Sequence, residues 1–480
     1  MRTRILLTLF FAAALLLTTP AIAAEFQAGA ATSNITPPLG TSLAGHMRDR
    51  AATDIHDELH ARCLVLDNGS TRLAFVLVDS CMVPRDTFDA AKARASEASG
   101  IPPAHMLMAA THSHTAACAT PVFQSDPTPE YNAFLTQRIA DGIVRAKNNL
   151  QPARIGWGVG KVEGEVFNRR WHMEEDAIPP NPFGGQDKVK MNPPRGHDAL
   201  IEPAGPVDTS VHVLAAQTPE GLPIALLANY SLHYVGGTAG PEVSADYFGY
   251  FARMAETELS DPLQEPGFVA MLSNGASGDI NNIDFTKPSE SKAPYEQMKH
   301  VARRVADEAV RIYADIEWRD QAALDAAVKD IARGVRKPDT DALERAREIL
   351  EEAGGEPLTT LPQIYARETV LLAEYPDTVD VPLQVVRIGE LGIAAIPCEV
   401  FCEIGLAVRE ASPFDTTFTI ELANGYNGYL PTAKQHALGG YETWRARSSY
   451  LDEAAADKIS KTVRGLFEAI MERPEHVAAQ

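Results

Sequence analysis

Cysteine and basic residues are both scarce in this chain of 480 residues. The five cysteines form neither a CxxC pair nor a dense disulfide framework, and an odd number leaves at least one of them unpaired. Cys63 and Cys81 lie in or beside apolar runs, so we expect both in the core. Lys and Arg total 43 against 64 Asp and Glu, a formal net charge of -21. This acidic balance argues against a nucleic acid or an anionic membrane surface as a partner.

Long apolar runs are also missing, except at the N-terminus. Arg2 and Arg4 precede the apolar segment Ile5–Leu17, which has the length of a signal-peptide core and is short for a membrane span. A small-x-small pattern follows it, as a signal peptidase requires. We therefore expect residues 1–24 to be a cleaved signal peptide, with an uncleaved anchor as the alternative. The exported mature chain, residues 25–480, then carries -23 (-21 - 2) and no transmembrane segment.

No repeat, low-complexity tract or obvious linker divides the mature chain, so we expect one large domain. Apolar strand-like runs alternate with amphipathic helical ones, which predicts an α/β fold in which helices cover a layered sheet. The expected strands are Ala61–Leu66, Leu73–Val78, Met106–Ala110, Val211–Ala216, Ile224–Ala228, Val269–Leu272, Leu383–Val386 and Ile393–Ile396, and the expected helices are Asp86–Ala98, Glu130–Asn148, Ala245–Leu259, Tyr295–Ile316, Phe401–Ser412 and Asp452–Met471.

One segment departs from this alternation. Lys337–Gly354 is charged and helix-favouring, with Asp339 or Thr340 as the N-cap and a glycine pair as the stop. We expect it within a helical excursion over about residues 320–375. Its composition is typical of a solvated surface helix without a function of its own.

Polar residues follow four of the expected strands. In open α/β sheets, ligands bind beyond the carboxyl ends of strands, so residues from these four places are expected to form one shared site. Taken singly, each has a structural explanation, because an HxH pair, a lone histidine or a carboxylate at a helix start is often only part of the packing. The four segments are Thr111–His114, Asn229–His233, Ser273–Asp279 and Pro397–Glu399.

Taken together and in order, short motifs along the mature chain resemble the catalytic domain of the neutral (non-lysosomal) ceramidases. The resemblance implies a ceramidase-like α/β domain that hydrolyses linear amide bonds in ceramide or another N-acyl compound. The additional C-terminal β-sandwich of that family is expected to be absent. The matching segments are Ile35–Pro38, Ile55–His56, Ala61–Arg62, Thr111–His114, Asn168–Arg169, His233, Gly278–Asp279, Pro397–Glu399, Tyr426–Tyr429 and Tyr441–Glu442.

The resemblance also implies the cofactor and the site. It implies one Zn²⁺, bound by His112, His233, Glu399 and Tyr429. Zinc lowers the pKa of a bound water to about 7 and thereby activates it for hydrolysis. The groups that contact the scissile amide and its oxyanion are then His114, Arg169 and Tyr441, and we expect substrate contacts from Asp279 and Asn274.

The sequence departs from the family pattern at Asn281. The family's Gly-Asp motif continues with a valine-like residue and then a catalytic serine, and Asn281 occupies that serine position. An amide is no nucleophile, so we expect Asn281 to orient the water or the substrate carbonyl, with no acyl-enzyme. The alternatives are that Asn281 caps a turn, or that Ser277 replaces the missing serine.

Two other functions fit the same residues. A zinc esterase on a related lipid-like substrate would use the same tetrahedral chemistry. A member that lacks the family serine could also bind a metal or ligand without catalysis. The expected partner in the leading interpretation is a small-molecule or lipid N-acyl substrate, and the sequence leaves the oligomeric state open.

Overall fold

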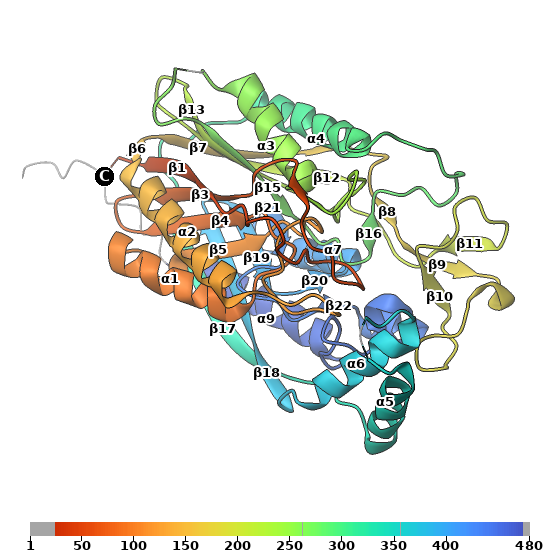
Figure 1. Cartoon of the computed structure of the whole chain (residues 1–480). Helices are drawn as coiled ribbons and strands as arrows, with labels where there is room; N and C mark the ends of the chain where they lie inside the picture. Colours follow the sequence, from red (N-terminus) through yellow and green to blue (C-terminus); the bar gives the residue numbers. More distant parts are fainter. Residues whose placement is uncertain (1–24, 262, 356, 474–480) are drawn as a thin grey trace, which may run out of the picture.

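Three helix-covered sheets surround a shared inner core in the computed structural model, which describes residues 25–261, 263–355 and 357–473 (Figure 1). The expected signal peptide lies outside these residues. Each sheet contains one pair of adjacent parallel strands joined by a helix, and its other strand pairs are antiparallel. The α/β prediction is therefore confirmed, with three larger sheets in place of one central sheet.

The first sheet pairs β4 and β5 in parallel through the crossover helix α1. Helices α1 (Arg85–Ser99) and α2 (Pro129–Asn148) cover its outer face with apolar side chains such as Phe88 and Ile139. The strand order is β5 (Met106–Ala110), β4 (Arg72–Val78), β3 (His60–Asp67), β1 (Gln27–Asn34) and β6 (Gln151–Pro152).

The second sheet has the same arrangement as the first. Its strands β13 and β15 are parallel, and the connection between them contains helix α3. Helices α3 (Asp246–Leu259) and α4 (Glu296–Asp315) pack on its outer face through residues that include Phe251 and Val305. The strand order is β15 (Val269–Asn274), β13 (Pro223–Tyr230), β12 (Ser210–Gln217) and β7 (Arg154–Lys161).

In the third sheet, strands β19 and β21 are parallel, and the connection between them contains helix α7. Helices α7 (Cys402–Glu410) and α9 (Ala455–Met471) cover it through residues such as Ile404 and Phe467. The strand order is β17 (Leu324–Gly334), β18 (Thr378–Ile388), β19 (Leu391–Ile396) and β21 (Thr416–Glu421).

The inner faces of the three sheets meet in one apolar cluster. Leu66 of the first sheet, Leu227 of the second and Ile393 of the third are all fully buried there. Burying side chains of this size contributes about 1.5–3 kcal/mol each, so the cluster holds the three sheets together. The sheets therefore keep a fixed relation to one another, which is what a site assembled from all three requires.

Short elements complete the fold between the sheets. Helix α8 comprises Ala433–Leu438, and a small three-stranded sheet lies beside helices α5 and α6 (Figure 1). The short strands are β2 (Asp54–Ile55) with β14 (Glu242–Val243), β8 (Phe167–Asn168) with β16 (Ile280–Asn281), β20 (Glu399–Val400) with β22 (Tyr429–Leu430), and β10 (Val189–Met191), β9 (Arg170–Met173) and β11 (Leu200–Pro203).

The helical excursion differs from its prediction. The expected range of about 320–375 begins with β17, which pairs along its whole length with β18. Only α5 (Thr340–Ala353) and α6 (Leu361–Ala373) are α-helical within it. Asp339 is the N-cap of α5, because its carboxylate accepts a hydrogen bond from the amide of Ala342 at 2.8 Å.

The remaining expected strands and helices are present, with shifted ends. Strands β1, β7 and β21 had no counterpart in the prediction. All five cysteines are free and buried, in agreement with the core positions predicted for Cys63 and Cys81. Among the described residues, no helix has the length and apolarity to cross a membrane.

Candidate metal-binding active site

Three buried side chains meet where the parallel strand pairs of the three sheets end. His112 follows β5, His233 follows β13, and Glu399 follows β19. His112 adopts a positive φ of 77°, a conformation that is costly for a residue with a Cβ. A hydrogen bond from its amide to the carbonyl of Ser80, at 2.8 Å, holds the backbone there. The expectation that strand ends deliver one shared site agrees with this arrangement.

The three side chains face one another at ligand distances. The Nε2 atoms of His112 and His233 are 2.8 Å apart. Oε2 of Glu399 lies 3.2 Å from Nε2 of His112 and 3.6 Å from Nε2 of His233. All three side chains are at most 2% exposed, so solvent does not separate them.

Hydrogen bonds on the far side of each imidazole fix its tautomer. Nδ1 of His112 lies 2.8 Å from the carbonyl oxygen of Cys81, and Nδ1 of His233 lies 3.1 Å from that of Ser277. A carbonyl only accepts, so each Nδ1 carries the proton and each Nε2 presents a lone pair. Two lone pairs and a carboxylate at this distance repel one another unless a cation lies between them.

The donor set fits a metal ion. Oε2 of Glu399 is buried and accepts no hydrogen bond in the described residues, while its Oε1 accepts one from the hydroxyl of Tyr426 at 2.9 Å. Burial lowers the pKa of His233 well below its ordinary value, so this imidazole is neutral as a metal ligand must be. Two imidazoles and a carboxylate are ligands that zinc accepts.

A second group of possible ligands is Cys81, His112 and His114. It competes poorly with the first, because burial raises the pKa of the Cys81 thiol and only the thiolate binds metal well. It would also need Nδ1 of His112, which already donates to a carbonyl.

Tyr429 and Tyr441 lie beside the cluster. Strands β20 and β22 run parallel and place Tyr429 opposite Glu399. The hydroxyl of Tyr429 accepts a hydrogen bond from Nη2 of Arg169 at 3.1 Å, and the ring of Tyr441 lies 5.7 Å away, edge to face. A cavity of about 20 Å³ is lined by both tyrosines together with His112, His114 and Glu399.

Arg169 is held rigidly at this cavity. Its Nη2 also donates to the carbonyl of Gly278 at 2.8 Å, and its Nε donates to Glu442 at 2.8 Å. The other oxygen of Glu442 accepts from Arg170 at 2.6 Å. Burial alone would raise the pKa of Glu442, but the charges of Arg170 and Arg169 outweigh it and the pKa is lowered. One carboxylate therefore fixes two buried guanidinium groups.

His114 lies next to the metal-ligand cluster. Its Nε2 is 3.2 Å from Nε2 of His112, and the ring of Tyr234 stacks on it at 3.7 Å. Burial lowers the pKa of His114 well below its ordinary value. His114 is therefore neutral near pH 7.

His233 and Arg169 do not line the cavity themselves but contact the lining residues His112 and Tyr429. Three further predicted site residues do not line it either. Both oxygens of Asp279 accept hydrogen bonds from within the fold, from the amide of Cys402 at 2.8 Å and the side chain of Asn168 at 2.7 Å. Burial raises the pKa of Asp279 to about 6. Asn274 is fully buried, and neither end of its amide has a hydrogen-bond partner in the described residues.

Asn281 is the third of these residues. Its amide nitrogen donates to the side chain of Asn192 at 2.7 Å, and its oxygen accepts from the amide of Ile283 at 3.1 Å. The amide of Asn192 in turn donates to the carbonyl of Arg169 at 2.8 Å. Asn281 thus contacts the site through the backbone that carries Arg169.

The sequence prediction assigned no role to several residues that shape the site. Tyr426 and Glu442 lay inside the recognised motifs, so motif position was the one available signal. Glu421 had no such signal. Its carboxylate accepts from the hydroxyl of Ser277 at 2.6 Å and from the amide of Val400 at 2.7 Å, and it steadies the turn whose carbonyl accepts from His233.

The comparisons with known proteins identify a family and two structures of similar fold. The family model described as neutral/alkaline non-lysosomal ceramidase, N-terminal, matches residues 26–301. The crystal structure of neutral ceramidase from Pseudomonas aeruginosa is similar with a TM-score of 0.70 and 20% identity, covering 95% of this chain and 76% of that one. A ceramidase complexed with C2 is similar with a TM-score of 0.68 and 20% identity, covering 95% and 77%. At this identity the two structures establish a shared fold.

Proposed function

Because this chain belongs to the neutral/alkaline non-lysosomal ceramidase family, we propose that it is a zinc-dependent hydrolase of linear amide bonds in ceramide or another N-acyl compound. The observation that carries the zinc assignment is the buried group of two Nε2 lone pairs and the unpartnered Oε2 of Glu399. Tyr429, placed opposite Glu399 by the strand pairing, is the proposed fourth ligand.

The side chains around this group match the needs of amide hydrolysis. Zinc, when bound, polarises a carbonyl and lowers the pKa of water. Arg169 and the hydroxyl of Tyr441 donate hydrogen bonds to the oxyanion of the tetrahedral intermediate, each worth about 10²–10³ in rate. His114, whose Nε2 lies 3.2 Å from Nε2 of His112, is placed to accept a proton from the attacking water and to deliver it to the leaving amine.

No serine nucleophile is part of this proposal. Ser277 is fully buried and does not line the cavity, so its hydroxyl is not presented to a substrate there. Asn281 is assigned a positioning role, since it contacts Arg169 through Asn192. Hydrolysis therefore proceeds by direct attack of water on the carbonyl, without an acyl-enzyme.

We also propose that the protein works outside the cytoplasm. Arg2, Arg4 and the apolar segment Ile5–Leu17 support this assignment. N-terminal sequencing of the protein purified from its native source should begin near Ala24 or Glu25. Recovery of a chain that retains Met1 would contradict export by cleavage.

The test of the zinc site uses the variants His112→Ala and His233→Ala, with His300→Ala as a histidine control on the outer helix α4. Both site variants should lose bound zinc by elemental analysis, and the control should keep it. Ceramide, N-acyl amines and the matching esters are then supplied, and released acid is measured by mass spectrometry. Site variants that keep stoichiometric zinc overturn the metal assignment. Zinc binding without turnover of any substrate overturns the enzymatic one, and exclusive turnover of esters overturns the amidase assignment.

A further inference from the structure

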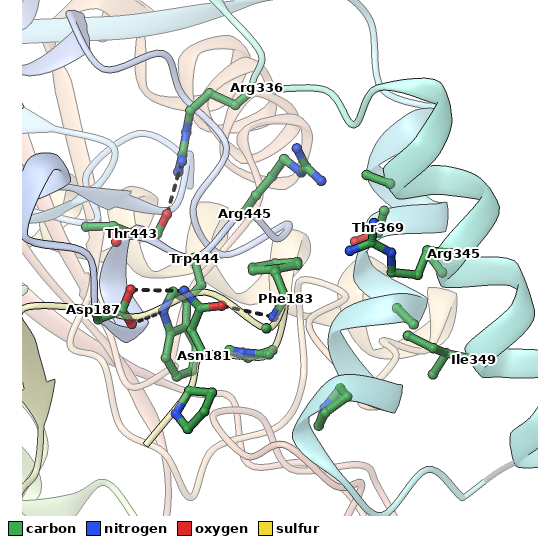
Figure 2. Close-up of a pocket in the computed structure, with 17 residues that line it drawn as sticks. Asn181, Phe183, Asp187, Arg336, Arg345, Ile349, Thr369, Thr443, Trp444 and Arg445 are labelled. Atoms are coloured by element: carbon green, nitrogen blue, oxygen red, sulfur yellow. Dashed lines mark hydrogen bonds between the residues drawn. The ribbon is translucent and has the colours of Figure 1, made fainter. Parts of the chain in front are cut away.

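A large cavity lies away from the metal-ligand cluster, between helices α5 and α6 and two loops (Figure 2). Its volume is about 850 Å³, within the usual range for small-molecule sites. Helix α5 lines it with Ala342, Arg345, Ala346 and Ile349, which are spaced as one face of a helix. We name it the arginine cavity, because Arg336, Arg345 and Arg445 all line it.

The charge of the arginine cavity is positive, although the chain as a whole carries -21. Asp187 is the one carboxylate among its lining residues, and its oxygens accept from the side chains of Asn181 at 3.1 Å and Trp444 at 2.7 Å. No ion pair within 4.0 Å joins any of the three guanidinium groups to a carboxylate of the described residues. Three cations against one anion leave a net charge of +2 (3 - 1).

The three arginines are arranged around an apolar surface. Arg336 is anchored, since its guanidinium donates to the carbonyls of Leu451 and Thr443. Arg445 lies over the ring of Phe183 at 5.8 Å, and its Nε is buried without a hydrogen-bond partner. Arg345 and Arg445 extend from opposite walls into the same space (Figure 2). Guanidinium groups presented in this way are suited to a carboxylate, sulfonate or phosphate.

A second cavity shares lining residues both with the arginine cavity and with the cavity at the proposed active site. It has a volume of about 170 Å³ and shares Trp444 and Asp187 with the arginine cavity. It shares Tyr441 with the cavity that contains the metal-ligand cluster. Its walls are largely apolar, with Met47 and Leu361 among them. The three cavities therefore follow one another from Tyr441 to the arginines, with apolar walls between.

We propose that the natural substrate is an anionic N-acyl amphiphile, whose anionic group binds Arg345 and Arg445 while its amide lies at His112, His233 and Glu399. This inference rests on the proposed hydrolase function and narrows its substrate class. An apolar segment separates the anion from the scissile amide and lies along the path past Trp444 and Tyr441. A neutral N-acyl lipid would bring no charge complementary to Arg345 and Arg445.

The kinetic test uses two pairs of substrates. The first pair is the 7-amino-4-methylcoumarin amide of dodecanedioic acid and its neutral counterpart, in which the free carboxylate is a dimethylamide. The second pair, N-hexanoyl-12-aminododecanoic acid and its dimethylamide, places the anion on the amine side. The wild-type enzyme should prefer one of the two carboxylates over its neutral counterpart, and the pair that shows this preference identifies the side that carries the anion.

The variant Arg345→Gln/Arg445→Gln should lose this preference. We expect kcat/KM for the preferred carboxylate to fall about 10–100-fold, mainly through KM, because a hydrogen bond to a charged group contributes about 1.5–3 kcal/mol. The neutral counterpart should change little. The matched control is Arg347→Gln, which removes the same charge from α5 at an exposed position outside the cavity.

A binding experiment separates failure of the inference from failure of the proposed function. Octyl phosphate should bind the wild-type protein at least 10-fold more tightly than octan-1-ol, by titration calorimetry, and the double variant should abolish the difference. Hydrolysis of both members of each pair at equal rates, with equal binding of the two octyl probes, overturns the inference and leaves the amidase function intact. Absence of all hydrolysis with tight octyl phosphate binding overturns the function, and the arginine cavity remains an anion site.

Discussion

Glu442 is the carboxylate on which two buried arginines depend. It is fully buried and accepts hydrogen bonds from Arg169 and Arg170. Removing its charge leaves two guanidinium groups without compensation, and breaking a buried ion pair in this way costs about 3–5 kcal/mol. We therefore expect Glu442→Gln to lower the free energy of unfolding by that amount and to lower kcat, since Arg169 loses its orientation. Urea unfolding and steady-state kinetics measure the two effects.

The lowered pKa of Glu442 also predicts how the free energy of unfolding depends on pH in the acid range. The folded-state pKa of Glu442 is lowered, so its contribution to stability is present above the unfolded value of about 4.5 and is lost as the pH falls through the folded value. Unfolding free energies measured from pH 7 to pH 3 should converge between wild type and Glu442→Gln. Parallel curves over this range would contradict the assignment.

Asn281 gives a second test at the residue scale. Asn281→Ala removes its hydrogen bonds to Asn192 and to the amide of Ile283, which should destabilise the protein by about 1–3 kcal/mol. Zinc content should be unchanged, and kcat should fall less than 10-fold if the residue acts through Arg169. A fall of more than 100-fold at unchanged melting temperature would instead support direct contact with the water or the substrate.

Sequence motifs predicted those site residues whose own side chains can bind a metal. His112, His233 and Glu399 are such residues, and the structure brings them together. The sequence could not reveal that Glu442 neutralises Arg169, because the two lie 273 positions apart and meet only in the folded chain. Asp279 and Asn281 belonged to the same motif as expected contacts, yet their side chains are engaged by the surrounding fold.

At the scale of elements, α5 was predicted as a helix with its N-cap, but the face that lines the arginine cavity was not. Its inward face carries Ala342, Arg345 and Ala346, with one larger apolar residue, Ile349, so the sequence has the composition of a solvated helix. Strands β1 and β7 were missed for a related reason. Their sequences, QAGAATSN and RIGWGVGK, are rich in Ala and Gly, which have low strand propensity, and tertiary packing decides their conformation.

The N-cap of α5 gives a prediction for this element. Asp339→Ala removes the hydrogen bond to the amide of Ala342, worth about 1 kcal/mol. Amide hydrogen exchange in α5 should accelerate roughly 5-fold, because the helix has one buried side chain, Ala346, and opens locally. The melting temperature of the whole protein should stay the same. Asp341→Ala, on the same helix, is the control, and equal acceleration in both variants would contradict the capping role.

At the scale of the whole molecule, the proposed metal ligands come from all three sheets. Metal binding should therefore stabilise the packing of the three sheets against one another as well as the site. A ligand present at about 1,000 times its Kd adds about 4 kcal/mol to the folded state. We expect chelation to lower the melting temperature by several degrees and to accelerate amide exchange near the ends of β5, β13 and β19 together. Acceleration confined to one of the three ends would contradict this coupling.

The spread of the ligands along the chain has a consequence for synthesis. His112 and Glu399 are separated by 287 residues (399 - 112), which a ribosome takes roughly 15–60 s to translate. Over that interval the nascent chain contains His112 and later His233, but not the carboxylate that completes the group. No shorter fragment can assemble the site, so hydrolytic activity appears only when translation is nearly finished. A chain that crosses a membrane before it folds would then take its metal from the compartment it enters.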